Sequence, residues 1–187
     1  MGKITVTKCD IEGLYIIEPQ VFPDARGYFF ESYNEQAFHA AGLDMKFVQD
    51  NQSKSTKGVL RGCHFQKTHP QGKLVRVISG SVFDVAVDMR KNSPTLGKWF
   101  GVELTGENNR MFYIPEGFAH GFLVLSDEAV FTYKCTDFYA PGDEGGMKWD
   151  DPDVGIKWPL TQDMNVLLSD KDQVLPAFKD AYRFENL

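Results

Sequence analysis

The sequence predicts an all-β fold, a sandwich or barrel of many short strands with a few short peripheral helices. Short apolar or alternating segments recur along the chain, and clusters of Gly, Asn, Asp and Pro separate them, which favours such a fold over βαβ units. Aromatic residues are abundant, with 15 Phe, 7 Tyr and 3 Trp, and this suits strands around an aromatic-lined interior. A length of 187 residues without a repeat or low-complexity linker favours a single domain over residues 1–187.

The expected strands follow one another in chain order. Each combines apolar or alternating residues with turn-forming residues at its ends. Gly80 and Ser81 separate two of them and predict a tight hairpin there. The expected strands are Leu14–Ile17, Tyr28–Tyr33, Val59–Phe65, Leu74–Ser79, Val82–Met89, Trp99–Leu104, Met111–Ile114, Phe118–Leu125 and Ala129–Thr136.

Helices are expected at two places. Early in the chain, Asn34 can cap a helix, Glu35 suits its first turn and Gly42 can end it. The C-terminal tail, from about residue 159 to 187, is expected to pack on the barrel as short helical pieces at Asp163–Leu168 and Pro176–Tyr182.

Composition limits the classes of partner. The net charge of −6 argues against nucleic acid as a partner, although a few placed cations can still bind an anionic ligand. Cys9, Cys63 and Cys135 are scattered and odd in number, which predicts reduced thiols in a cytoplasmic protein. The N-terminus lacks a signal-peptide core, and no apolar run reaches the roughly 18 residues of a membrane span, so we expect no membrane partner.

Two segments resemble the paired motifs of cupin barrels, Gly58–Gln66 and Pro115–His120. In metal-binding cupins the first motif supplies His-x-His and then Glu, and the second supplies another His. Here His64 occupies the first position, Gln66 replaces the second His, and Lys73 stands where the Glu would be. An ammonium has no lone pair for a metal and repels a divalent ion, so no metal site is predicted.

A lysine in place of a metal suggests related chemistry. A metal in such a pocket polarises a carbonyl oxygen, and an ammonium can stabilise the same developing oxyanion. Lys73 therefore points to enolate chemistry, with a base next to a ketone.

Many motifs in the same order resemble the dTDP-4-dehydrorhamnose 3,5-epimerase family. The resemblance extends from about Gly13 to Asp172. It rests on Asp24–Gly27, Phe47–Asn51, Arg61–Gln66, Gln71–Arg76, Phe83–Arg90, Ile114–Phe122, Tyr133–Lys134, Trp149–Pro152 and Leu168–Asp172.

The resemblance implies a cupin-like jelly-roll β-barrel, a homodimer and no cofactor. It implies inversion at C3 and C5 of dTDP-4-dehydro-6-deoxy-D-glucose, which gives dTDP-4-dehydro-L-rhamnose in dTDP-L-rhamnose biosynthesis. Epimerisation at C3 or C5 alone, a noncatalytic sugar-nucleotide binding module and a metal cupin are the alternatives, and the final pathway sugar is left open.

The resemblance also implies four catalytic residues. His64 would be the base, because imidazole exchanges protons near neutral pH, and Asp172 would hold its ring. Tyr133 would be the acid on the far face, and Lys73 would stabilise the oxyanion.

The nucleotide-binding positions are likewise carried over from the family. Tyr139 matches a residue that stacks on thymine, and His120 has the alternative role of a hydrogen-bonded residue behind the base. If N-terminal strands are exchanged between subunits, Arg26 and Glu31 would serve the partner's pocket. The full set is Arg26, Glu31, Gln49, Asp50, Asn51, Arg61, His120, Tyr139, Glu144 and Lys171.

Strand parity raises one difficulty. Arg61 and His64 are three residues apart, so strict alternation places them on opposite faces. Either Gly62 introduces a bulge, or Arg61 reaches the ligand around the sheet edge.

Asp84 and Asp88 share a parity and are expected to face the pocket, without an assigned role. Two further expectations are that Cys63 packs in the core rather than acting as a nucleophile, and that His69 is exposed in a loop.

Overall fold

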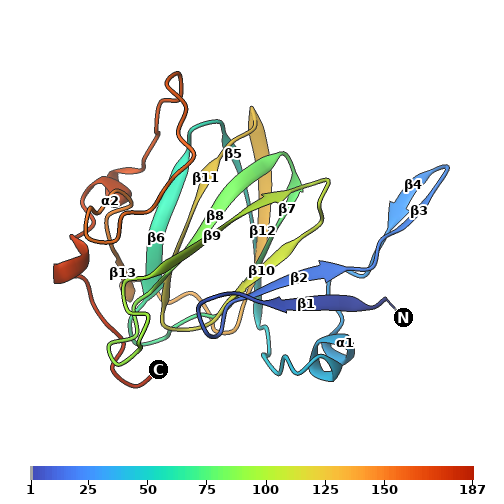
Figure 1. The fold of residues 1–187 in the computed structure, drawn as a ribbon, viewed down its shortest axis with the longest axis horizontal. Coiled ribbons are helices and arrows are strands. Elements are labelled where there is room, and N and C mark those ends of the chain that lie inside the picture. Colours follow the sequence, from blue (N-terminus) through green and yellow to red (C-terminus); the bar gives the residue numbers. More distant parts are fainter. Residues whose placement is uncertain (1) are drawn as a thin grey trace.

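The computed structural model describes residues 2–187 as two antiparallel sheets that face each other, with a separate N-terminal hairpin (Figure 1). The hairpin consists of β3 (Phe22–Asp24) and β4 (Gly27–Phe29). The six-stranded sheet has the order β1 (Ile4–Lys8), β2 (Tyr15–Pro19), β10 (Met111–Ile114), β7 (Lys73–Ser79), β12 (Glu128–Cys135) and β5 (Gln49–Thr56). The five-stranded sheet has the order β13 (Glu144–Gly146), β6 (Leu60–Gln66), β11 (Phe118–Val124), β8 (Ser81–Asp88) and β9 (Trp99–Thr105).

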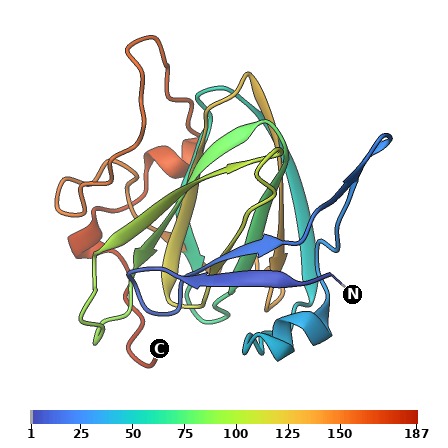
Figure 2. The ribbon, with the colours of Figure 1, turned by 45° about the vertical axis from the view of Figure 1, so that its right-hand side comes forward.

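The main core lies between the two sheets. The six-stranded sheet contributes Val75 and Phe131, and the five-stranded sheet contributes Val82 and Phe122 to the same cluster. Figure 2 shows the two sheets curving around this shared interior. Burial of apolar side chains from both inner faces is the main favourable contribution to such a fold, and the all-β class is confirmed.

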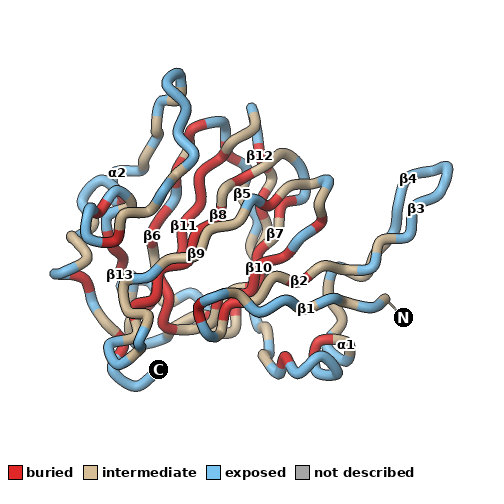
Figure 3. Tube along the Cα trace, viewed as in Figure 1, coloured by how far each residue is buried: buried red, intermediate tan, exposed pale blue. Residues whose placement is uncertain are grey.

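Both outer faces are covered by chain segments. The C-terminal segment packs Phe184 and Val154 on Val85 and Val87 of β8. Helix α1 (Glu35–Ala40) and the residues after it pack Phe38 and other apolar side chains on the six-stranded sheet. Buried residues concentrate in the central strands, whereas the hairpin is exposed along its length (Figure 3).

The strand predictions are confirmed for most of the sheet, with differences at its periphery. Only the first part of the expected strand Tyr28–Tyr33 is extended, as β4. The structure adds β1, β3, β5 and β13, of which β5 is the longest. Its sequence is polar throughout (QDNQSKST), so an apolar pattern could not reveal it.

The expected hairpin at Gly80 is wrong. β7 pairs with β10 and β12, whereas β8 pairs with β11 and β9, so the chain crosses from one sheet to the other at this glycine. Gly80 has a φ of +80° and lies against the backbone of β12. The positive φ of a glycine turn is shared by hairpins and by corners between sheets, which is why the sequence did not separate them.

The early helix is confirmed at both ends. The Asn34 side chain accepts a hydrogen bond from the amide of Ala37 at 3.2 Å, and Gly42 follows the helix with a φ of +80°. These are the N-cap and C-terminal glycine that the sequence predicts.

The tail prediction is partly wrong. A 3₁₀ turn, η1 (Phe178–Asp180), lies within the expected segment Pro176–Tyr182, but Asp163–Leu168 forms no helix. Leu167 instead bonds to the entry of β6, with its amide on Gly58 O at 2.9 Å and its carbonyl on the amide of Leu60 at 3.0 Å. These sheet-like bonds use the backbone amide and carbonyl of Leu167, which a helix would pair within itself. The short helix α2 (Asp170–Gln173) begins just afterwards, capped by Ser169.

Across residues 2–187, no helix has the length and apolar character needed to cross a membrane.

Candidate active site

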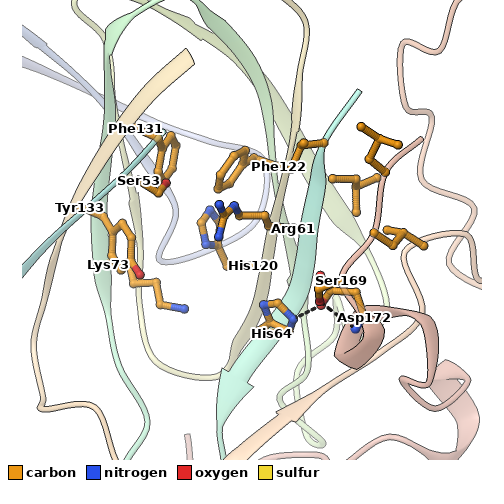
Figure 4. A pocket seen from close by; sticks show the side chains of 14 residues that line it. Ser53, Arg61, His64, Lys73, His120, Phe122, Phe131, Tyr133, Ser169 and Asp172 are labelled. Carbon is orange, nitrogen blue, oxygen red and sulfur yellow. Dashed lines mark hydrogen bonds and ion pairs between the residues drawn. The ribbon is translucent and has the colours of Figure 1, made fainter. Parts of the chain in front are cut away.

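A cavity of about 450 Å³ opens between the two sheets. Its walls combine aromatic rings with a small number of polar and charged side chains, as ligand pockets commonly do. Figure 4 shows these side chains converging from both sheets and from α2. The polar residues that line it are Ser53, Arg61, His64, Lys73, His120, Tyr133, Ser169 and Asp172.

His64 on β6 and Asp172 on α2 form a hydrogen-bonded pair through Nε2 and Oδ1. The Asp172 side chain is 3% exposed, whereas the His64 side chain is 43% exposed. Burial alone would raise the pKa of Asp172, but its bonds with His64 and Ser169 outweigh burial and lower the pKa. An ionised carboxylate on Nε2 orients the ring and leaves Nδ1 as the nitrogen for proton transfer.

Ser169 holds the carboxylate of this pair in place. Its hydroxyl donates to Asp172 Oδ2 at 2.9 Å, and it also caps α2 by accepting from the amide of Asp172 at 3.2 Å. The polar sequence around Asp172 is therefore both a helix cap, as its composition indicates, and part of the site.

Tyr133 and Lys73 lie across the cavity from His64. Figure 4 shows Tyr133 on the opposite side, with the Lys73 side chain extending between the two. Burial raises the pKa of Tyr133, so its phenol remains a proton donor at neutral pH. Burial lowers the pKa of Lys73, while the nearby Cys135 and Asp84 act in the opposite direction.

Asp84 forms a second carboxylate–imidazole pair. It is fully buried on β8, and His120 Nε2 lies 3.0 and 2.9 Å from its two oxygens. Burial raises the pKa of Asp84, although His120 and Lys73 oppose that effect. His120 stands directly opposite His64 in the β11–β6 ladder and also lines the cavity. Both roles considered for His120 are thus compatible with its position.

The expectation that Asp88 faces the pocket is wrong. Asp88 lies at the end of β8, where its carboxylate accepts hydrogen bonds from Arg90, Ser93 and Thr95 at 2.6–2.9 Å. It shares a face with Asp84, as parity predicts, but the strand carries it past the cavity to the turn that follows.

A bulge resolves the difficulty with Arg61 and His64. On β11 the partners of these residues are Phe122 and His120, so three steps along β6 match two along β11. Gly62 occupies the irregular position with a φ of +117°, as the bulge hypothesis requires. Both side chains consequently line the cavity, where Arg61 donates to Ser55 Oγ at 3.2 and 3.1 Å.

A second polar group lies on the strands and loop beside the cavity. Gln49 and Asn51 on β5 are joined by a 3.1 Å hydrogen bond, and the amide of Tyr139 donates to Gln49 Oε1 at 2.9 Å. Lys171 Nζ lies 3.0 Å from Glu144 Oε2. Bonds from Lys171 and then Tyr139 lower the pKa of Glu144. The predicted binding residues Gln49, Asn51, Tyr139, Glu144 and Lys171 are therefore connected among themselves.

Of the ten predicted binding residues, Arg61 and His120 line the cavity, whereas Arg26, Glu31 and Asp50 belong neither to its wall nor to the polar group beside it. Arg26 lies in the turn of the β3–β4 hairpin, 2.6 Å from Asp24, and the hairpin projects from the body of the molecule (Figure 1). Glu31 accepts the amide of Gly2 at 2.7 Å. Asp50 is a correction: strand alternation turns it to the outer face of β5, where it pairs with Lys134 at 2.9 Å.

The former metal-ligand positions serve other contacts. Gln66 is buried and bonded to backbone groups of two loops, and Lys73 lines the cavity. Within residues 2–187 no group of three or more His, Cys, Asp or Glu side chains is arranged to hold a metal ion.

Two smaller expectations are confirmed. Cys63 is fully buried among apolar residues, and burial raises its pKa to about 12, which leaves no thiolate nucleophile. His69 is exposed in its loop.

The fold and the cavity together define a cupin-type protein with an imidazole–carboxylate pair on one wall of its pocket and a phenol on the other. A sequence model of the dTDP-4-dehydrorhamnose 3,5-epimerase family matches residues 8–180. The chain belongs to this family of isomerases.

Individual relatives agree with that assignment. The dTDP-4-dehydrorhamnose 3,5-epimerase of Methanothermobacter thermautotrophicus is 57% identical over 173 residues, covering 92% of this chain and 94% of the relative. The crystal structure of the Elizabethkingia anophelis epimerase is similar with a TM-score of 0.89 at 54% identity, over 95% of this chain and 97% of that one. The dTDP-6-deoxy-D-glucose-3,5-epimerase of Legionella pneumophila, in complex with dTDP-4-keto-L-rhamnose, gives a TM-score of 0.91 at 49% identity, over 95% and 94% of the two chains.

Proposed function

We propose that this protein inverts C3 and C5 of dTDP-4-dehydro-6-deoxy-D-glucose to give dTDP-4-dehydro-L-rhamnose, a step of dTDP-L-rhamnose biosynthesis. The observation that carries the proposal is the placement of His64 and Tyr133 on opposite sides of one cavity, with Lys73 between them. Inversion requires a proton to leave one face of a carbon and to return on the other, so a base and an acid must face each other.

The C4 ketone makes the chemistry accessible. It acidifies the hydrogens on both neighbouring carbons, C3 and C5. His64 Nδ1 removes one of them, and the C–H electron pair moves into the ring to form an enolate with its negative charge on the C4 oxygen. Asp172 stabilises the resulting imidazolium, and Lys73 stabilises the oxyanion.

Tyr133 completes each inversion. Its phenol gives a proton to the opposite face of the carbon as the enolate returns to the ketone. The imidazolium then loses its proton to solvent and the phenolate regains one, so each epimerisation leaves the enzyme unchanged. The same groups act at C3 and at C5, which one pocket allows when the sugar ring shifts or turns between steps.

The neighbouring polar residues are proposed to bind the nucleotide. Arg61 has a guanidinium fork suited to a diphosphate, and Tyr139 is proposed to stack on thymine. Asp50 has no part in this proposal because it faces away. The other proposed contacts on the same chain are Gln49, Asn51, His120, Glu144 and Lys171.

We further propose a homodimer in which the β3–β4 hairpin of one subunit reaches the cavity of its partner. Phe22, Tyr28 and Phe29 expose large aromatic surfaces on this hairpin, and such patches commonly mark protein interfaces. Arg26 and Glu31 would then contribute to the partner's site, which accounts for their distance from their own.

Single-domain organisation, a cytoplasmic location and independence of metals are part of the same proposal. The inter-sheet core draws on residues from Cys9 to Tyr133, and Cys9, Cys63 and Cys135 are all free. Metal analysis of the purified protein tests the last point: stoichiometric iron, manganese or zinc would contradict it.

Hydrogen exchange with solvent is the decisive experiment. The enzyme is incubated with the dTDP-4-keto sugar in deuterated water, and the product is examined by NMR. Deuterium at both C3 and C5 with inverted configuration is expected. Label at a single carbon would reduce the enzyme to a mono-epimerase, and no label at all would leave a binding module.

A further inference from the structure

We propose that Gln66 is a positioning residue that fixes the loop carrying Tyr139 and thereby sets the affinity for the nucleotide. The inference rests on the proposed function in one respect, the stacking of Tyr139 on the nucleobase. It gives a role to the residue that occupies a metal-ligand position in metal-binding cupins and takes no part in the proton transfers.

All hydrogen-bonding groups of the Gln66 amide are used. Its Nε2 donates to the carbonyl of Phe138 at 3.1 Å and to the carbonyl of His69 at 2.7 Å. Its Oε1 accepts from the amide of Ala140 at 2.8 Å. The side chain is therefore bonded to the backbone on both sides of Tyr139, and only 4% of Gln66 is exposed.

The Tyr139 side chain shares a hydrogen bond with Glu144 but is not packed in the core. It is 49% exposed, so core packing does not fix its position. Its own amide donates to Gln49 Oε1 at 2.9 Å. The backbone of three consecutive residues is thus held by two glutamine side chains, one from β5 and one from β6.

Only a primary amide can make this set of bonds. A carboxylate at residue 66 would place negative charge against two carbonyl oxygens, and a neutral imidazole offers one donor and one acceptor. An aliphatic side chain could make none of these three hydrogen bonds. The requirement for two donors and an acceptor is a physical reason why β6 carries glutamine here and not the second histidine of a metal site.

The expected consequence is a change in binding without a change in chemistry. Gln66 lies two residues after His64 on β6, but it touches neither Asp172 nor Tyr133 among its hydrogen bonds. Without the bonds from Gln66, the loop would become ordered at Tyr139 only when the nucleotide binds. The entropy lost in that ordering would then oppose binding. Fixing one residue costs enough free energy to weaken binding about tenfold.

The test compares Gln66→Leu and Gln66→Glu with the wild-type enzyme. Calorimetry with dTDP alone measures the dissociation constant without turnover, and steady-state kinetics with the dTDP-4-keto sugar give kcat and KM. Each variant is expected to raise both the dissociation constant and KM about tenfold, with kcat within about twofold of wild type. Thermal melts identify a variant that does not fold. Gln66→Glu keeps the shape of the side chain and an acceptor for Ala140, so it tests the proposal if Gln66→Leu fails to fold.

A double-mutant cycle with Tyr139→Ala separates positioning from a general structural role. If Gln66 acts through Tyr139, then Gln66→Leu should change the dissociation constant of dTDP by less than about twofold in the Tyr139→Ala background. Additive effects would overturn the proposal, as would unchanged dTDP affinity in both Gln66 variants or in Tyr139→Ala.

Gln71→Leu is the matched control. Gln71 donates to the carbonyl of Asp137 at 2.8 Å in the same loop, but it is not bonded to residues 138–140. This variant is expected to keep dTDP affinity within about twofold of wild type, and an effect as large as that of Gln66→Leu would contradict the assignment. Because dTDP binding is measured without turnover, failure of this inference is distinguishable from failure of the epimerase proposal, which deuterium exchange by the wild-type enzyme reports.

Discussion

His64 depends on a carboxylate that lies 108 residues further along the chain. Replacing His64 by alanine should stop proton exchange at the carbons beside the ketone, because it removes the imidazole that Asp172 holds in the cavity. A general base typically contributes about 10²–10⁴-fold, so the exchange rate is expected to fall by at least that factor. Deuterium incorporation measured by NMR gives the rate, and dTDP binding serves as the control for an intact pocket. Near-normal exchange would show that another group is the base.

Tyr133→Phe is expected to separate exchange from inversion. The ring remains, but the proton donor on the far face is lost, so His64 should return a solvent deuteron to the face from which it took the proton. The predicted result is labelled substrate with retained configuration and little epimerised product. Labelled product at the wild-type rate would remove Tyr133 from the acid role.

The same tyrosine predicts the alkaline limit of the wild-type enzyme. Because burial raises the pKa of Tyr133, its acid form persists beyond the ordinary value of about 10. Product formation should therefore be lost through deprotonation of this phenol only above about pH 10, which a pH profile of kcat would measure.

The structure brings the four proposed catalytic residues His64, Lys73, Tyr133 and Asp172 to one cavity, and the sequence could single them out because recognisable motifs surround them. The sequence was less able to place side chains whose direction depends on the sheet. Asp50 stands between Gln49 and Asn51, yet alternation turns it outward to Lys134. The contact between Asp84 and His120 joins two strands and has no local signal in either.

At the level of the strand, the irregular position in β6 is the feature on which the site depends. A methyl group on Gly62 would lie 2.5 Å from both Gly121 Cα and His120 O, and the φ of +117° disfavours any side chain. Gly62→Ala is expected to lower the free energy of unfolding by at least about 2 kcal/mol and to reduce kcat, because Arg61 and His64 lose their common face.

Gly142→Ala provides the control for this variant. Gly142 also has a positive φ, +87°, but nothing lies within 4 Å of the position that a methyl group would take there. Its cost should be limited to backbone strain of about 1 kcal/mol, with kcat unchanged. Denaturant unfolding and kinetics compare the two, and equal losses of activity would argue against the role of the bulge.

Most elements could be predicted from apolar alternation, since each central strand turns one face to the shared core. β5 was not predicted because its inward-facing residues are polar. Ser53 among them lines the cavity and is not part of the apolar core. The segment Asp163–Leu168 was misassigned because its backbone bonds to residues a hundred positions earlier, and no local pattern reports that. Pairing between strands was likewise beyond what the sequence could predict, as the crossing at Gly80 illustrates.

For the whole molecule, the proposed exchange of the hairpin between subunits predicts the activity of mixtures of two variants. His64→Ala removes the base from a chain's own cavity, whereas Arg26→Ala would impair the partner's cavity. Unfolding and refolding the two variants together should produce mixed dimers in which one of the two sites is intact. About half of the dimers are mixed, so about a quarter of the sites should be active. Activity no greater than the sum of the separate variants would indicate that Arg26 serves its own chain or none.

The position of α2 has a consequence for how the enzyme comes into being. Domains generally fold as units, and the strands of both sheets precede Asp172 in the sequence. A chain that stops before Asp172 would lack the carboxylate that holds His64 and also the C-terminal segment that packs Phe184 with Val85 and Val87. Premature termination would therefore remove the partner of the proposed base and part of the core in the same event, so the shortened product should not persist as a folded but inactive competitor for the sugar nucleotide.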